Sequence, residues 1–542
     1  MTEFDPTQRR FLADLISKTA ILRKEQQTIL SASGEKLDWL IDMRRIFLNA
    51  DALDVIAGLF WDHYARIAPI QVAGMEVASV PLVAALILKA RERGIPANGL
   101  LIRKERKTTG TGQIIEGVPN EDPVVLIDDV VNSGNSLEKA LAALRQSLLS
   151  LREVFVVIDY KSEAGLEWRK KKNIDVTSLF DLSEFGLAVK SQPPLPISDY
   201  AIAWRYYSPG AFPFHTVPKS TPLLVGDKIY MGLEKGAMAC VDAKTGKTVW
   251  EFPIAMDHTK GVWSSPAHHA GRIYFGAYNG CVYCLDAKTG AVIWANPCCD
   301  WVGSSPLIVE KHNMLYLGLE YQRHRAMGSN AALDLDTGSR VWEIPQKKYQ
   351  HGSAAYFEPI DAVIFGNADH NLSAYEAKTG KLIWQSDTER SLKYPPAIDA
   401  QRGHVIGTSF DGKIYVVDAT TGRKLAAFHT NDICYTTPLI YKNKIFAGSG
   451  DKHMYVIDAD TLQLIKRMDC GSRVYSSPRV INGRVVFGTN GGRIIELDPD
   501  TLDVLAVSQL PDAIPNAIAS SPDGSMMYAA THMNEIYAIQ CK

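Results

Sequence analysis

Residues 242–250 read DAKTGKTVW, and the phrase returns as DAKTGAVIW (286–294), DLDTGSRVW (334–342) and EAKTGKLIW (376–384). It then decays to DATTGRKLA (418–426), DADTLQLIK (458–466) and DPDTLDVLA (498–506). The prolines that precede successive units, from Pro222 to Pro522, are 40 to 44 residues apart, except for one gap of 90 that holds a degenerate copy. Short strands in repeats of about 40 residues are typical of β-propeller blades. The repeats predict seven complete blades and an eighth unit, 520–540, with only three strands.

The turn inside each unit has a clear chemical logic. Asp and Thr side chains can bond nearby backbone N–H groups, and Gly supplies the positive φ that such a turn needs. The Trp after the turn can pack between neighbouring blades. The eighth unit lacks this fourth strand, but residues 200–207, which include Trp204, have a strand-like composition. An unpaired strand edge invites aggregation, so we expect residues 200–207 to pair with 535–540 and complete blade eight.

The first 190 residues follow another pattern. Helix-period sequence fills 7–30 and 50–67, and apolar strand runs alternate with helices from residue 70 onward. This alternation predicts an α/β domain with a mainly parallel sheet. The Pro-rich stretch 191–198 is then a spacer between a domain of residues 1–190 and a propeller of residues 199–542.

The sharpest local signal is VVLIDDVVNSGNSL, residues 124–137. Four apolar residues predict a buried strand that ends in Asp128-Asp129, and a small polar loop then leads to a helix near Leu137. Amides and hydroxyls at a helix N-terminus form an anion site, and paired carboxylates can accept bonds from sugar hydroxyls or hold hydrated Mg²⁺. Together these groups suit a phosphorylated ribose.

The motif resembles the phosphoribosyl pyrophosphate (PRPP) loop of type I phosphoribosyltransferases, and the match to orotate phosphoribosyltransferases spans about residues 20–188. The resemblance implies that Asp128 and Asp129 bind the ribose, and Mg²⁺ through PRPP. It also assigns the remaining PRPP-binding residues as Val130, Asn132, Ser133, Gly134, Asn135 and Ser136. Like that family, the domain is expected to form a homodimer.

Three further stretches extend the resemblance in the family's order. Residues 73–81 look like the loop that holds pyrophosphate, which assigns that role to Met75, Glu76, Val77, Ala78 and Ser79. Residues 33–36, with Asp42 and Arg44, resemble the segment over the base, so Lys36 becomes a base-site candidate. Residues 103–117 resemble the mobile catalytic loop. Basic groups there would stabilise charge on departing pyrophosphate, a catalytic role that falls to Arg103, Lys104 and Lys107.

Two positions depart from that family's pattern. Thr109 stands where the catalytic loop usually has His, and Tyr160, the second base-site candidate, stands where an Arg usually contacts the orotate carboxylate. Tyr cannot form a bidentate carboxylate clamp. We therefore expect a PRPP- and Mg²⁺-dependent transferase that acts on another nucleobase-like acceptor. The alternative is a catalytically altered PRPP or nucleotide sensor, a regulatory or antiviral effector that signals through the propeller.

The repeats resemble quinoprotein-type propellers, many of which are binding scaffolds, so a protein partner on the propeller is expected. Pyrroloquinoline quinone (PQQ) is not, because no cofactor constellation or export signal stands out. A net charge of -2 gives no direct nucleic-acid signal, and the longest apolar stretch, 80–88, is too short for a membrane span. All eight cysteines lie at or after Cys240, which is unlike a secreted disulfide scaffold and favours a cytoplasmic protein. The basic run 169–172 is interpreted as a solvated surface turn.

Overall fold

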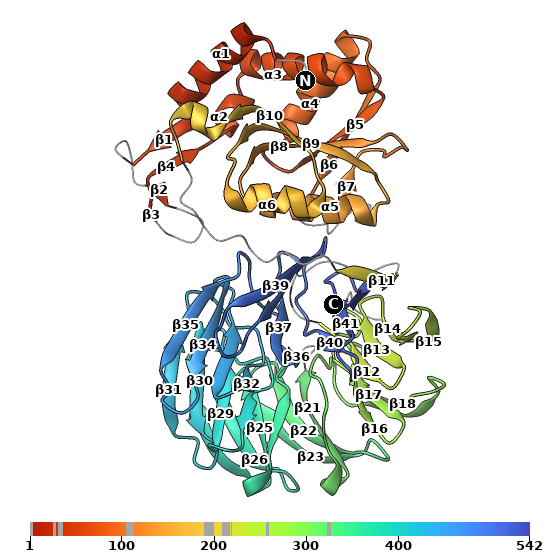
Figure 1. Ribbon diagram of the computed structural model, residues 1–542. Helices are drawn as coiled ribbons and strands as arrows, with labels where there is room; N and C mark the ends of the chain where they lie inside the picture. The colour runs from red at the N-terminus through yellow and green to blue at the C-terminus, as the bar shows by residue number, and fades with distance from the viewer. Residues whose placement is uncertain are drawn as a thin grey trace. The chain divides into compact units, whose positions relative to one another are not determined.

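The computed structural model describes residues 4–24, 29–30, 36–103, 113–188, 200–208, 217, 219–255, 260–321 and 327–541. The chain divides into a first compact unit of Met1–Ile197 with Gln509–Pro511, and a second of Ser198–Ser508 and Asp512–Lys542. The first unit is α/β and the second is an eight-bladed propeller, which confirms both predicted fold classes (Figure 1). The predicted spacer, 191–198, lies outside the described residues. No helix in the described ranges is both long enough and apolar enough to cross a membrane.

The first unit is built on a six-stranded sheet in the order β10-β9-β8-β5-β6-β7. Its strands are β5 (Ile70–Met75), β6 (Ala97–Ile102), β7 (Ile115–Glu116), β8 (Val124–Val131), β9 (Leu151–Asp159) and β10 (Val176–Asp181). All neighbours are parallel except β6 and β7. Its helices are α1 (Pro6–Leu15), α2 (Arg44–Phe47), α3 (Ala50–Tyr64), α4 (Val80–Glu92), α5 (Asn135–Gln146) and α6 (Glu163–Lys172).

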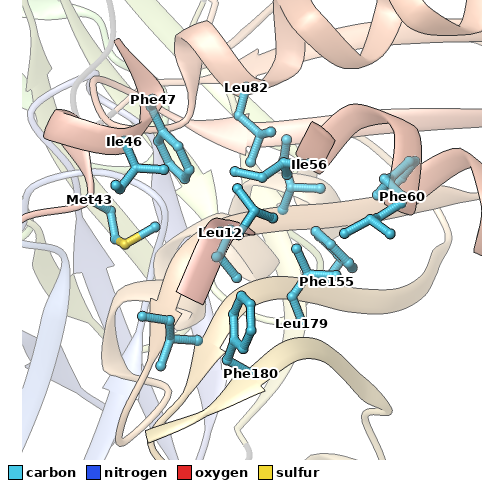
Figure 2. Close-up of a cluster of buried hydrophobic side chains, with 14 of the residues drawn as sticks. Leu12, Met43, Ile46, Phe47, Ile56, Phe60, Leu82, Phe155, Leu179 and Phe180 are labelled. Atoms are coloured by element: carbon cyan, nitrogen blue, oxygen red, sulfur yellow. The ribbon is translucent and has the colours of Figure 1, made fainter. Parts of the chain in front are cut away.

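The central strand β8 is apolar on both faces because helices cover both. Val125 and Ile127 join one buried cluster with residues of α1, α3 and α4. Val124 and Leu126 point the other way and join a second cluster with residues of α5 and α6. Figure 2 shows part of the first cluster, where Leu12 of α1, Phe60 of α3 and Phe155 of β9 meet. A continuous apolar run is therefore the sequence pattern of a strand buried on both sides.

Two expectations about local structure were wrong. The helix expected over 7–30 is helical only to Ala20, and β1 (Ile21–Arg23) follows because it pairs with β4 (Trp39–Ile41). A second short pair joins β2 (Ile29–Leu30) to β3 (Lys36–Leu37). The strand β8 also continues past Asp128-Asp129 to Val131, because β9 pairs with it as far as Asp159. The helix α5 accordingly starts at Asn135, so the polar loop is limited to residues 132–134.

The propeller consists of eight four-stranded antiparallel sheets. Seven are sequential: β12–β15 (223–253), β16–β19 (267–297), β20–β23 (307–346), β24–β27 (354–387), β28–β31 (397–429), β32–β35 (439–469) and β36–β39 (479–509). The eighth joins the strands β40 (Ala519–Ser520), β41 (Met526–Ala530) and β42 (Ile536–Gln540) to β11 (Ala201–Tyr206). The strand expected at 200–207 thus closes the ring, with Ala201 opposite Gln540 and Tyr206 opposite Ile536.

Tryptophan side chains join neighbouring blades in one repeated way. The Trp204 indole N–H donates to the carbonyl of Ala243 at 3.1 Å, and its ring lies against Gly246 in the next blade's turn. The same donation to the following blade recurs at Trp250, Trp294, Trp342 and Trp384. At one of the three positions where the repeat has lost its Trp, the Lys466 ammonium donates to the Leu502 carbonyl at 2.7 Å instead.

Candidate functional site

Two of the predicted loops lie at the same edge of the first unit's sheet. Strands β5 and β8 are parallel neighbours, with Gly74 opposite Ile127, so their carboxyl ends meet there. Residues 76–79 form the turn from β5 into α4, and the Glu76-Val77 peptide bond is cis. The buried Ser79 hydroxyl lies 3.5 Å from the Ile127 carbonyl oxygen, directly before Asp128. The turn of residues 76–79, where pyrophosphate binding is predicted, and the carboxylate pair are therefore neighbours at the edge of the sheet where ligands of such folds bind.

The carboxylate pair is held by backbone hydrogen bonds. The Asp129 N–H donates to Asp128 Oδ1 at 2.9 Å, and the Val130 N–H donates to Asp129 Oδ1 at 2.8 Å. Burial, together with the negative charge of Asp129, raises the pKa of Asp128 to about 8, although a hydrogen bond from Ser136 acts in the opposite direction. Burial also raises the pKa of Asp129. Two adjacent carboxyl groups away from water repel each other when both are ionised. A cation or hydroxyl donors placed between them would therefore stabilise the doubly ionised pair.

The loop after β8, residues 132–134, packs against α6 and its N-cap residue Ser162. The Gly134 backbone has a φ of +79°, and a Cβ there would lie 2.2 Å from the Trp168 indole, so only glycine fits. The Ser162 hydroxyl donates to the Asn132 carbonyl at 2.9 Å. No side chain of the described residues caps α5, which begins at Asn135. Its first-turn N–H groups therefore have no side-chain cap, which is the condition under which a helix N-terminus can bind an anion.

Arg103 lies beside the pyrophosphate turn. Its Nη1 is 3.5 Å from Glu76 Oε2 in that turn and 3.4 Å from Glu116 Oε1 on β7. The guanidinium is thus held at the turn by two carboxylates while a quarter of its side chain remains exposed. Lys104, Lys107 and Thr109 lie outside the described residues.

Four side chains gather near Asp129 as a candidate base site. The Trp39 and Tyr160 ring centroids are 5.7 Å apart. Burial raises the pKa of Tyr160, and the charge of Asp129 raises it further, so the phenol is neutral near neutral pH. Arg44 clasps Asp42, with Nε to Oδ1 at 2.7 Å and Nη2 to Oδ2 at 3.2 Å. The base-site candidate Lys36 lies on β3, at the start of the segment that carries this cluster.

Two groups of residues at or beside the site were not predicted from the sequence. Trp39 joins the base-site cluster, and only its position between Lys36 and Asp42 could have indicated it. The basic run 169–172 was wrongly interpreted as a solvated turn, because it is the last turn of α6. There Arg169 binds the fully buried Asp159 through two bonds of 2.8 and 3.0 Å, and Lys172 Nζ lies 3.4 Å from Glu138 Oε2.

That buried pair stabilises the strand end beside Tyr160. Burial alone would raise the pKa of Asp159, but hydrogen bonds from Arg169 and Lys161 hold it below its usual value. An arginine, Arg169, therefore lies near Tyr160, but its guanidinium is bound to Asp159. The Asp159-Arg169 pair sets the position of Tyr160, whose N–H donates to the Val131 carbonyl at 2.9 Å.

The carboxylate pair also fits the magnesium ion that PRPP chemistry implies. Mg²⁺ prefers hard oxygen ligands and is often held by one or two carboxylates together with substrate phosphates. Asp128 and Asp129 supply such oxygens at the sheet edge, next to two loops suited to phosphate. Elsewhere in the described ranges, no three His, Cys, Asp or Glu side chains gather in a way that could hold a metal.

Comparisons with known proteins agree with this division. A family model described as a phosphoribosyl transferase domain matches residues 45–191. A model described as outer membrane protein assembly factor BamB matches residues 195–262, 234–433 and 410–542. Orotate phosphoribosyltransferase of Methanothermobacter thermautotrophicus is 31% identical over 179 residues, which cover 33% of this chain and 94% of that enzyme. The Rhodopirellula baltica enzyme is 30% identical over 187 residues, covering 33% and 95%.

Solved structures resemble the propeller. A europium-containing methanol dehydrogenase has a TM-score of 0.51 at 14% identity and covers 63% of this chain and 93% of its own. The quinohemoprotein alcohol dehydrogenase of Comamonas testosteroni has a TM-score of 0.52 at 14% identity, covering 63% and 76%. At this identity the likeness concerns the fold alone. Both family resemblances inferred from the sequence are confirmed.

Proposed function

Because the chain belongs to the orotate phosphoribosyltransferase family through its first unit and to the BamB repeat family through residues 195–542, we propose that the first unit is an active phosphoribosyltransferase. It would transfer 5-phosphoribosyl from PRPP to a ring nitrogen of a nucleobase-like acceptor. The observation that supports this best is the buried Asp128-Asp129 pair, which lies between the pyrophosphate turn 76–79 and the uncapped start of α5.

Different residues of the site are proposed to bind different parts of PRPP. Asp128 and Asp129 accept hydrogen bonds from the ribose hydroxyls, and residues 132–136 bind the 5′-phosphate with backbone N–H groups and hydroxyls. The turn of residues 75–79 holds pyrophosphate, with Arg103 beside it. Mg²⁺ bound through PRPP and this carboxylate pair would neutralise phosphate charge.

In the reaction, the bond between the anomeric carbon and the pyrophosphate oxygen breaks, a bond from that carbon to the acceptor nitrogen forms, and the proton on that nitrogen passes to the leaving pyrophosphate or to solvent. The leaving pyrophosphate carries away the bonding electrons, so its negative charge grows as the bond lengthens. The Arg103 guanidinium at the turn would stabilise this growing negative charge. Electrostatic stabilisation of this kind is usually the largest contribution to catalysis.

The acceptor is proposed to be an uncharged base. The base site offers the neutral phenol of Tyr160 and the Trp39 ring, while Arg44 is already clasped to Asp42. A carboxylate buried beside Tyr160 would lack a bidentate partner. Orotate is therefore expected to be a poor acceptor or none.

The test is calorimetric titration of the full chain with PRPP, with and without Mg²⁺. The double variant Asp128→Asn, Asp129→Asn should abolish binding because it removes both negative charges and their acceptor oxygens. Asp62→Asn, which changes an exposed carboxylate on α3, is the matched control and should bind PRPP normally. Undiminished binding in the double variant would disprove the assignment.

A second function remains in competition because the base site lacks a free arginine. In that alternative the first unit binds PRPP or a nucleotide without catalysis and reports this through the propeller. Incubation with PRPP and a panel of bases distinguishes the two. Pyrophosphate release with any base supports the transferase, and PRPP binding without release across the panel supports the sensor. In either case the propeller is proposed to present loops to a protein partner.

A further inference from the structure

The propeller contains a cavity of about 310 Å³ that the first unit's chemistry does not use. Its walls come mainly from the segments just before the innermost strands of six successive blades. Those strands are β12 (Leu223–Val225), β16 (Ala267–His269), β20 (Leu307–Val309), β24 (Ala354–Phe357), β28 (Ala397–Asp399) and β32 (Leu439–Tyr441). Small-molecule sites usually occupy about 300–1,000 Å³, so the cavity is large enough for a small organic ligand.

Three lysines line this cavity. Lys219 is buried and forms an ion pair with Glu234, with Nζ 2.5 Å from Oε1. Lys260 lies over two aromatic rings, with Nζ 4.7 Å from the centroid of Trp263 and 4.9 Å from that of Tyr278. Lys393 lies over Phe410, 4.8 Å from its centroid. The ammonium groups are therefore held at aromatic faces inside the ring.

The described residues that line the cavity include these three lysines and no aspartate or glutamate. Glu320 is fully buried, and its Oε1 lies 2.8 Å from His351 Nδ1. Burial lowers the pKa of both Lys260 and Lys393, and the charge of Glu320 acts to raise both. The charge of Lys260 lowers the pKa of Lys393 further. Glu320 therefore acts on both ammonium groups, while the two ammonium groups repel each other, so an anion placed between them would be stabilised.

The aromatic rings add a second requirement. Trp263 and Tyr278 lie with their centroids 5.4 Å apart, and Phe410 lies 4.8 Å from Tyr435. Such surfaces favour a ligand with a planar ring. Among the described residues that line the cavity, the basic side chains are three lysines and His351, with no arginine. Lysine binds phosphate as a point charge, whereas planar carboxylates are better matched by arginine.

We propose that this cavity binds a nucleoside 5′-monophosphate, with its base against the aromatic rings and its phosphate between Lys260 and Lys393. The site is distinct from the PRPP site and does not require the first unit to be active. If the first unit does make a nucleotide, the cavity would take a ligand of the same chemical class as that product.

The experiment must separate this site from the first unit. Calorimetric titration is therefore done on the full chain carrying Asp128→Asn and Asp129→Asn, with UMP, AMP and GMP as probes. At least one of them should bind, and should quench tryptophan fluorescence. Adding Lys260→Gln and Lys393→Gln should weaken that binding at least ten-fold. The matched control is Lys424→Gln, because Lys424 also lies over a ring, that of Tyr415, but does not line the cavity.

Two smaller probes test the two halves of the proposed ligand. Ribose 5-phosphate, which lacks the ring, and the matching nucleoside, which lacks the phosphate, should each bind at least ten-fold more weakly than the nucleotide. Equal binding of ribose 5-phosphate would overturn the proposal in favour of a simple phosphate site. Binding lost with the carboxylate pair in the first unit, or unchanged by the lysine substitutions, would also overturn it.

A further variant covers the case in which the lysine substitutions prevent folding. In Gly303→Ala, the new methyl group would lie 2.8 Å from the Tyr278 hydroxyl and 3.0 Å from Glu320 Oε1, so it narrows the cavity without removing a charge. Nucleotide affinity should fall while the melting temperature changes little. Unchanged affinity in this variant would place the ligand elsewhere.

Discussion

The closure of the propeller by β11 can be tested at Trp204. In Trp204→Ala, the indole loses its hydrogen bond to Ala243 at 3.1 Å and its contact with Gly246. The tilted contact with Tyr528, at a centroid distance of 5.9 Å, is lost as well. The first two contacts join β11 to blade one, and the third joins β11 to β41 within blade eight.

The expected cost follows from these contacts. The hydrogen bond contributes about 1 kcal/mol. Replacing a fully buried Trp by Ala costs about 3–5 kcal/mol, and because Trp204 is only partly buried, the loss of packing is about half of that. The hydrogen bond (about 1 kcal/mol) and the packing (about 1.5–2.5 kcal/mol) together should destabilise the propeller by about 2.5–3.5 kcal/mol. Trp204→Phe keeps a ring but loses the donor, so it should cost about 1 kcal/mol.

The matched control is Trp294→Ala, inside the ring. Trp294 is also partly buried, donates to Leu335 at 3.2 Å and lies 5.9 Å from the ring of Tyr274. Scanning calorimetry of the full chain should therefore show similar losses for Trp204→Ala and Trp294→Ala in the propeller's transition. A normal transition for Trp204→Ala beside a clear loss for Trp294→Ala would refute closure by β11.

Three further outcomes are expected. Tyr160→Arg should raise the rate with orotate at least ten-fold over the parent chain, measured as orotidine monophosphate formed, and no gain would contradict the base-site assignment. Arg169→Leu should destabilise the first unit by about 3–5 kcal/mol in calorimetry, because it leaves the buried Asp159 charge without its main partner; a normal transition would show that the pair is unimportant. In five of the blade turns, hydrogen bonds from the turn threonine lower the pKa of the turn aspartate, for Asp242 to about 2. This stability is therefore present above the ordinary aspartate pKa of about 3.9 and is lost as the pH falls through the lowered values. The propeller's melting temperature should fall over that window, and a flat profile would contradict it; the aspartates are Asp242, Asp286, Asp418, Asp458 and Asp498.

Most of the fold could be predicted because its signals are local. Each blade carries its own turn and Trp, and apolar runs mark strands such as β8 and β9 without knowledge of distant residues. The failures depended on pairing across the chain. Nothing within residues 21–23 shows that they will meet Trp39–Ile41 and end the helix early. Likewise, β8 extends beyond Asp129 only because β9 continues beside it.

The candidate site was predictable to the same degree. Asp128, Asp129 and the residues after them follow one another in sequence, so their chemistry could be inferred directly. Trp39 could not be placed beside Tyr160 without the fold, because the two are far apart in the chain. Arg169 was misjudged because four consecutive basic residues look solvated, while helical geometry turns one of them towards the buried Asp159.

The pairing of β11 with β42 also sets an order of events during synthesis. Ala201 leaves the ribosome roughly 340 residues before its partner Gln540, which at about 5–20 residues per second is a delay of roughly 20–70 s. During that interval seven blades can form in sequence while β11 has no partner strand. The last step of folding is therefore a long-range closure that joins the earliest and latest strands of the ring, and it is the step at which a nascent propeller is most exposed to pairing with a neighbouring chain.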